Sequence, residues 1–388
     1  MLSSILSYIM IMVVLYLVSN RMVLSYNRQT TQYNRFSLLN PASVFFVVFF
    51  TLVFAVRYNV GVDFVNYLDE YQSVYKLEYS KNEILYKNIG LFLNSIGAHP
   101  SVFFGCFVFL QITFFLLAVK KEIFVLPFLI IFLFANSEIQ TWMNIIRSAT
   151  GMCIWLYAVD FATDRKLWKY VALCIFASCF HRISLAYIFL YPVILFACKI
   201  EITRKWQYGI VACAFIVRIL FETFATQIIP LVSIFQSILG GENDYYANYD
   251  VQTMLMDLDN EKSGTGIAFL AKLIIDLIII FNSNKIIKFY DSSKFKTYYF
   301  LFIVALFTFY CFPDSVISFS RPFRYFYVFR TLMLGYFSYY LYRNRNIGLN
   351  GLCLFLISCL YLSLFLFNQV FAKPEFCVWY QTWFNYTL

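Results

Sequence analysis

Charged residues are scarce in this sequence. They make up 13% of its 388 residues, about half the share that is usual in a soluble globular domain. So little charge does not cover the surface of a soluble protein of this length. Hydrophobic residues reach 61% and aromatic residues 22%, and phenylalanine, tyrosine and tryptophan suit lipid and its interfaces. The composition therefore predicts an integral membrane protein.

Several signatures of soluble enzymes are missing. The sequence contains no glycine-rich phosphate loop, no zinc-ligand spacing and no nucleophile elbow. Its ten cysteines include no C-x-x-C pair and lie mostly in apolar runs, where cysteine acts as a small packing residue. The net charge of +9 comes from short clusters between apolar runs, which excludes a basic nucleic-acid-binding domain. We expect no cofactor, no bound metal ion and no nucleic-acid partner.

Apolar segments recur along the whole chain. A membrane-spanning helix needs about 20 mostly apolar residues, and twelve segments approach this, which predicts an all-α polytopic bundle in a single integral membrane domain, residues 1–388. The N-terminal segment lacks a basic leader and a cleavage site, so we expect it to be retained as a span. The predicted spans lie near residues 2–19, 41–56, 101–119, 123–138, 142–160, 168–181, 184–198, 207–225, 266–281, 297–312, 325–342 and 348–367.

The connections between these segments predict the orientation. Every second connection is short and carries lysine or arginine, which is typical of cytoplasmic loops. The alternate set contains two longer connections, 57–100 and 226–265, which we expect outside together with both termini. Within the first of them, apolar residues of 83–97 recur at helical spacing and predict a short amphipathic helix.

Arginines also occur at the predicted outer ends of spans, where topology does not require them. Each alone is compatible with an interfacial or structural charge, but they come from distant parts of the chain and share one depth. Arginine is permanently charged and binds phosphate oxygens through a planar fork. The set indicates a site for the diphosphate of a lipid, and consists of Arg57, Arg147, Arg182, Arg321 and Arg324.

Charges inside the predicted spans have two interpretations. Arg218 and Glu222, and likewise Lys272 and Asp276, stand four residues apart, which predicts structural ion pairs on one helix face. Ionisable residues within spans also occur in ion-coupled transporters. Asp276 therefore keeps a transport function open.

In three places the sequence resembles the EpsG/Wzy-type polysaccharide polymerases, which are bacterial inner-membrane glycosyltransferases that join lipid-linked repeat units. The residues are Arg57 with Gly61-Val62-Asp63 and Tyr67; Asn144 with Arg147 and Ala149; and Phe180-His181-Arg182 with Ser184. Arg321, Arg324 and Tyr325 match the later outer arginines of the family more loosely. Ser148 stands where the family often has glutamine, and Ile183 separates Arg182 from Ser184.

The resemblance implies a GT-C-like membrane glycosyltransferase with its active site facing the periplasm. Donor and acceptor would be glycans linked to undecaprenyl pyrophosphate, and partners would include membrane lipid and a chain-length regulator. Arg147 would stabilise the leaving diphosphate, with Arg57, Arg182, Arg321, Arg324, Tyr67 and Tyr325 binding the diphosphate or the glycan. Asp63 and His181 are the first candidates for the base, followed by Asp244 and Glu138, and Asp63 could instead brace Arg57.

Three other functions stay open. An O-antigen ligase-like transferase would use outer arginines in the same way, but its long outer loop usually carries arginine and histidine, and 226–265 has neither. A flippase or other transporter of lipid-linked sugars would need charges along a path through the bilayer, which Arg218, Asp276 and Arg330 keep possible. A membrane-bound O-acyltransferase is the weakest of the three.

Overall fold

The computed structural model describes residues 2–29, 38–79, 83–240, 266–312 and 321–385. In these ranges the chain forms α-helices and short 3-10 helices, and no β-sheet. Its contacts divide it into two compact units, Met1–Cys198 with Leu334–Leu388, and Lys199–Met333. Each unit is described by itself.

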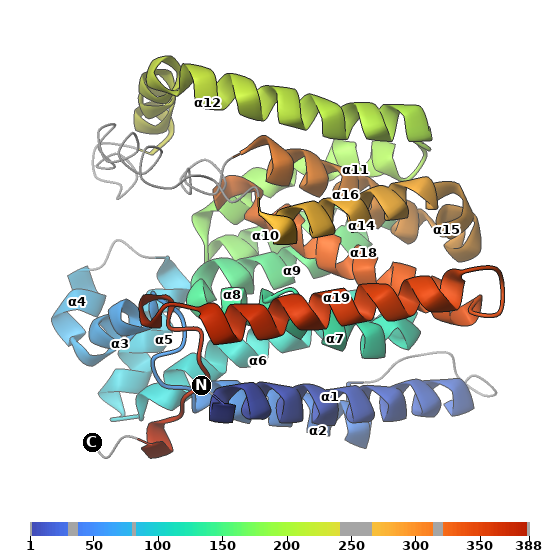
Figure 1. The fold of residues 1–388 in the computed structure, drawn as a ribbon. Helices are drawn as coiled ribbons and strands as arrows, with labels where there is room; N and C mark the ends of the chain where they lie inside the picture. Colours follow the sequence, from blue (N-terminus) through green and yellow to red (C-terminus); the bar gives the residue numbers. More distant parts are fainter. Residues whose placement is uncertain (1, 30–37, 80–82, 241–265, 313–320, 386–388) are drawn as a thin grey trace. The chain divides into compact units, whose positions relative to one another are not determined.

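The first unit is built around α6 (Pro100–Val119), whose side chains are mostly buried. It packs against α2 (Pro41–Ala55) and α9 (Ile146–Thr163), and α9 in turn packs against α10 (Leu167–Ser178). Helix α1 (Leu2–Gln29) runs beside α2 (Figure 1). Helix α7 (Leu126–Ala135) follows the 3-10 helix η1 (Lys120–Val125) and contacts α1 and α19 (Asn350–Phe371).

Three short helices follow α2 in the connection predicted to be outside. They are α3 (Phe64–Gln72), α4 (Val74–Tyr79) and α5 (Ile84–Ser95). Helix α5 lies within the predicted amphipathic helix 83–97 and buries Tyr86, Gly90 and Leu93, whereas Ile84, Phe92 and Ile96 are exposed. Because α3 and α5 both pack on α6, this connection is a folded part of the first unit.

Two helices of this unit are interrupted next to the motifs. The predicted span 142–160 is divided into α8 (Glu138–Asn144) and α9 by Ile145, whose φ of −108° and ψ of 57° are not helical. Helix α10 is followed at His181, in extended conformation, by the 3-10 helix η2 (Arg182–Leu190) and α11 (Tyr191–Ala197). The interruptions leave Arg147 and Arg182 in the first turns of new helices.

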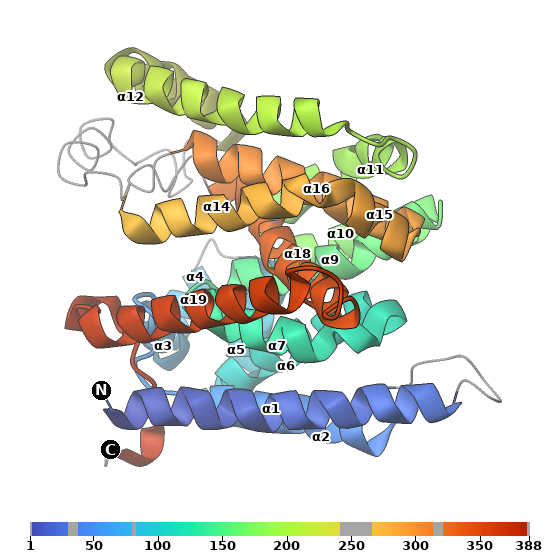
Figure 2. The same cartoon turned by 45° about the vertical axis from the view of Figure 1, so that its right-hand side comes forward.

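The second unit contains α12 (Arg204–Gly240), α14 (Ile267–Phe281), α15 (Ser283–Tyr290), α16 (Ser293–Cys311) and the start of α18 (Arg324–Arg343), preceded by η3 (Arg321–Phe323). Helix α12 packs against α14 and α16 (Figure 2). Helix α12 continues into the predicted outer connection 226–265 and ends at Gly240. The largely apolar sequence Ile228–Gly240 supports a helix, and the rest of that loop lies outside the described residues.

All twelve predicted spans fall largely on helical residues. Among the described residues, the stretches Leu2–Tyr26, Pro100–Ala135 and Asn350–Phe371 are long and apolar enough to cross a membrane. Helices α14 and α15, bent by 61° from one another, would add a fourth if they form one span. The fold is therefore helical with several apolar helices, whereas twelve spans and a GT-C-like arrangement stay predictions.

Candidate functional site

Arg57 lies fully buried just after α2. Its guanidinium donates through Nη1 to the carbonyl of Phe54 at 2.9 Å and through Nη2 to the carbonyl of Met143 at 3.1 Å. Its guanidinium carbon lies 4.8 Å from the centre of the Phe104 ring. Burial lowers the pKa of Arg57 to about 10, so the group stays charged at neutral pH. Arg57 therefore joins α2 to α8 from inside the protein, and its guanidinium is not at the surface where we expected it to bind diphosphate.

The turn after Arg57 packs against the interruption between α8 and α9. Gly61 has a φ of +94°, which side chains rarely adopt, and a Cβ there would lie 2.9 Å from the Cα of Asn144. The side-chain oxygen of Asn144 accepts a hydrogen bond from the backbone N–H of Asp63 at 2.9 Å. The first two motifs are thus in direct contact.

A segment near the C-terminal end of the described chain holds the same turn. Its main chain pairs with residues 56–61 through three hydrogen bonds, from Tyr58 N to Gln381 O at 2.9 Å, from Gly61 N to Cys377 O at 2.8 Å and from Trp383 N to Val56 O at 3.1 Å. The Trp383 ring packs edge-on against Tyr58, with centroids 4.6 Å apart. No sequence motif predicted this contact, because residues 377–383 carry no candidate charge and lie outside every predicted span.

Arg147 forms an ion pair with Glu83. Its Nη1 lies 2.8 Å from Glu83 Oε2, and the two side chains are 27% and 9% exposed. The other carboxylate oxygen, Oε1, accepts a hydrogen bond from the backbone N–H of Arg182 at 3.2 Å. One carboxylate therefore joins the first turn of α9 to the first turn of η2, and brings the second and third motifs together.

Two tyrosines flank the Arg147 guanidinium. Tyr67 lies within hydrogen-bonding reach of it, and the centre of the Tyr86 ring is 5.2 Å from its central carbon. Burial raises the pKa of Tyr67 to about 12 and also raises the pKa of Tyr86, so both hydroxyls are protonated at neutral pH. The Tyr86 hydroxyl donates to Glu70 at 2.8 Å. Arg147 thus lies between a carboxylate and aromatic faces, with part of its side chain exposed.

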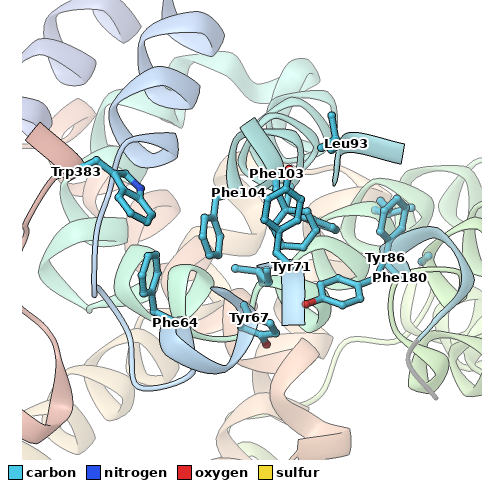
Figure 3. Packing of buried hydrophobic residues seen from close by; sticks show 13 residues of the cluster. Phe64, Tyr67, Tyr71, Tyr86, Leu93, Phe103, Phe104, Phe180 and Trp383 are labelled. Carbon is cyan, nitrogen blue, oxygen red and sulfur yellow. The ribbon is translucent and has the colours of Figure 1, made fainter. Parts of the chain in front are cut away.

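A cluster of buried rings fixes these helices on α6 (Figure 3). Phe64 stacks on Phe104 and Tyr71 stacks on Phe103, each pair with centroids 4.8 Å apart. Such pairs contribute about 0.5–1.5 kcal/mol each beyond the area that they bury. The cluster comprises Phe64, Tyr67, Tyr71, Tyr86, Leu93, Phe103, Phe104, Phe107, Ile146, Ile154, Ala177, Phe180 and Trp383.

The remaining predicted site residues have varied surroundings. In the first unit, Asp63 and His181 are partly exposed, and the side chain of Arg182 is exposed. Arg57 donates to main-chain carbonyls, and the suggested brace from Asp63 stays a prediction. In the second unit, Arg324 is partly exposed and Tyr325 is buried. Glu138 is buried in α8, while Asp244 and the side chain of Arg321 lie outside the described residues.

The second unit contains a buried ion pair of its own. Asp276 binds Arg330 at 2.7 Å and accepts a hydrogen bond from the Tyr310 hydroxyl at 2.6 Å. Asp276 thus pairs with a residue of α18, whereas the sequence predicted Lys272, which lies close enough to act on it electrostatically. Arg218 lies against the ring of Phe269, and the side chain of its predicted partner Glu222 lies outside the described part of the chain. The Asp276–Arg330 pair accounts for two of the charges inside the predicted spans without a transport path.

Glu83 is the residue of the candidate site that sequence reasoning missed. It stands 64 residues before Arg147 and 99 before Arg182, and it looks like a polar loop residue ahead of an amphipathic helix. The only available signal was an acidic side chain in a predicted outer connection of a chain with few charges. Where the structure describes the chain, no group of three or more histidine, cysteine, aspartate or glutamate side chains is placed to hold a metal ion.

Comparison with known protein families matches residues 42–388 to the model of the EpsG family. Comparisons with curated proteins and with solved structures find no significant match. The match includes all three motifs that meet at Glu83 and the turn after Arg57.

Proposed function

The chain belongs to the EpsG family, and on this premise we propose that it polymerises lipid-linked oligosaccharide repeat units by glycosyl transfer. Its apolar helices and its family indicate a membrane protein of polysaccharide biosynthesis. The observation that carries the proposal is the convergence on Arg147 of three motifs from distant parts of the chain. It gives a partly exposed cation a fixed place beside polar groups at one end of the helices.

In the proposed reaction, a hydroxyl oxygen of the acceptor repeat unit attacks the anomeric carbon of a glycan on undecaprenyl pyrophosphate. The new glycosidic bond forms as the bond from that carbon to the diphosphate oxygen breaks. The hydroxyl proton goes to a base, and undecaprenyl pyrophosphate leaves with the bonding electrons. Arg147 stabilises the charge that develops on the diphosphate, because its guanidinium is held beside Tyr67 and the Tyr86 ring.

Asp63 and His181 are the proposed bases. Both are partly exposed and both stand in segments that converge on Arg147. Arg182 extends an exposed guanidinium from the same turn, which suits a second contact with the diphosphate. Tyr67, whose hydroxyl is within reach of Arg147, would align the glycan or the diphosphate beside it.

Arg57 takes a positioning role in this proposal, because its guanidinium is buried and donates to the main chain. Arg321, Arg324 and Tyr325 are further proposed ligands of the diphosphate or the glycan. The site would face the periplasm from the inner membrane, and a chain-length regulator would be a protein partner. No cofactor is needed for this chemistry.

Analysis of glycan length in a deletion strain tests the proposed function. A lost polymerase leaves single capped repeats, a lost ligase leaves unattached polymer, and a lost flippase leaves intermediates in the cytoplasmic leaflet. Complementation with Arg147→Ala should leave single repeats, while Arg345→Ala, a change of an exposed arginine in a basic connection, should restore long polymer. Long polymer from Arg147→Ala at wild-type protein levels would refute the role of Arg147.

A further inference from the structure

Glu83 holds two hydrogen-bond donors that point at one position. Arg147 Nη1 lies 2.8 Å from one carboxylate oxygen, and the backbone N–H of Arg182 lies 3.2 Å from the other. Glu83 is the residue before α5, yet its side chain makes no capping hydrogen bond to its own helix. The carboxylate is therefore directed at donors of two other helices.

Carboxylates and phosphates are interchangeable ligands of such donors. Each presents two oxygens with delocalised negative charge to a guanidinium fork or to the N–H groups at the start of a helix. A diphosphate bound at Arg147 would need the same Nη1 and the same N–H group that Glu83 now occupies. It cannot bind there in full while the carboxylate stays.

We propose that Glu83 is an internal stand-in for the substrate diphosphate, which displaces it from Arg147 and from the Arg182 N–H when the lipid-linked glycan binds. This inference rests on the proposed function. In the resting protein the carboxylate neutralises Arg147 and keeps its guanidinium oriented. Displacement by a more highly charged diphosphate restores a charged hydrogen-bonding partner to both donors.

The exposures of the two side chains are consistent with this exchange. Arg147 is 27% exposed and Glu83 is 9% exposed, so solvent reaches the cation without passing through the carboxylate. When a carboxylate of the protein competes with the ligand, the apparent affinity for the ligand is the intrinsic affinity multiplied by the fraction of sites that the carboxylate leaves open. Removing the charge of Glu83 should therefore tighten diphosphate binding, whereas a purely structural glutamate would give the opposite result.

The test measures binding to the purified full-length protein in detergent, with undecaprenyl pyrophosphate as one probe and inorganic pyrophosphate as the other. Glu83→Gln keeps the shape of the side chain and removes its charge, and we expect it to bind both probes about tenfold more tightly. Glu70→Gln is the matched control, because it removes a nearby negative charge that is bound to Tyr86 and leaves both donors occupied. It should change the affinity less than about twofold.

Arg147→Ala separates this inference from the proposed function. If Arg147→Ala weakens the binding of both probes and Glu83→Gln fails to tighten it, the stand-in role of Glu83 is wrong and the diphosphate site at Arg147 is supported. If Arg147→Ala binds as the wild type does, the site itself is wrong. Tightening of the lipid probe alone by Glu83→Gln would also overturn the stand-in, because the vacated donors contact only the diphosphate.

Should Glu83→Gln fail to fold, Glu83→Asp provides the second variant. Its shorter carboxylate cannot reach both donors at once, so it should tighten binding of both probes by a smaller factor than glutamine. Unchanged or weaker binding by this variant would overturn the inference.

Discussion

Replacing Arg57 should cost stability, whereas replacing Arg147 should cost binding. The Arg57 guanidinium makes two buried hydrogen bonds to carbonyls, at 2.9 and 3.1 Å. Hydrogen bonds to a charged group contribute about 1.5–3 kcal/mol each, and the contact with the Phe104 ring adds about 1 kcal/mol. These contributions sum to about 4–7 kcal/mol, and we expect Arg57→Ala to destabilise the first unit by at least about 4 kcal/mol. Arg57→Lys should destabilise the unit by about half as much, because its single ammonium replaces a guanidinium that donates to two carbonyls.

The assay is thermal unfolding of the purified protein in detergent. A loss of about 4 kcal/mol should lower the apparent Tm by roughly 10 °C in a unit of this size. Arg147→Ala is the matched comparison, because its partly exposed ion pair contributes only about 1 kcal/mol and its Tm should fall by about 3 °C. Wild-type Tm for Arg57→Ala, together with lost diphosphate binding, would refute the buried clamp and make Arg57 a ligand-binding residue.

Three further changes test other parts of the structure. Asp276→Ala should destabilise the second unit by about 3–5 kcal/mol, because it leaves Arg330 charged and buried without its carboxylate; a melting curve measures the loss. Gly61→Ala should cost about 1–3 kcal/mol, because of the positive φ and the approach of Asn144, and should reduce polymer length in cells. Removing residues 377–388 should abolish polymerisation while the protein still inserts into the membrane, as glycan gels and membrane fractionation would show.

Each of these three has its own control. The double variant with Asp276→Leu and Arg330→Met should melt higher than Asp276→Ala, since it leaves no unpaired charge, and an equal or lower Tm would contradict the pairing. Gly348→Ala changes another glycine with positive φ, but nothing lies within 4 Å of its added Cβ, so it should keep full polymer length. Long polymer from the variant that lacks residues 377–388 would contradict the role of the C-terminal segment.

Composition and periodicity predicted the long apolar helices, but not the short helices α3, α4 and α15. Each predicted span coincides with helical residues because long apolar runs in a chain with few charges leave no other way to satisfy the backbone in lipid. Within the first unit, Lys121, after α6, forms an ion pair with Asp164, after α9, and the turn after Arg57 contacts Asn144. Which side of a membrane these connections face stays a prediction.

The interruption at Ile145 was harder to predict than the one at His181, which falls at the boundary between the predicted spans 168–181 and 184–198. Ile145 lies in sequence that continues an apolar pattern, and no glycine or proline marks the break. Tertiary contacts stabilise both interruptions, because Asn144 accepts from the turn at Asp63, and Glu83 accepts from the N–H of Arg182. Periodicity reports a local preference, so it does not detect a helix end that is stabilised by partners about 80 or more residues away.

Candidate arginines were found from their charge and position, but their roles depended on burial. Arg57 and Arg147 look alike in sequence, as single arginines at predicted outer boundaries. In the structure, Arg57 is buried and donates to two main-chain carbonyls. Arg147 is partly exposed and pairs with a carboxylate. The partner of Asp276 was also beyond reach, because Arg330 lies 54 residues away on another helix, whereas spacing in sequence detects only neighbours on the same helix.

The most direct measurement of the proposed function follows bond formation in liposomes. Purified protein is supplied with a repeat unit linked to undecaprenyl pyrophosphate, and both glycan length and released undecaprenyl pyrophosphate are quantified. We predict longer glycans, one lipid diphosphate released for each bond formed, and loss of both with Arg147→Ala. Lipid-linked repeats that cross the bilayer or move to another lipid without lengthening would contradict a polymerase.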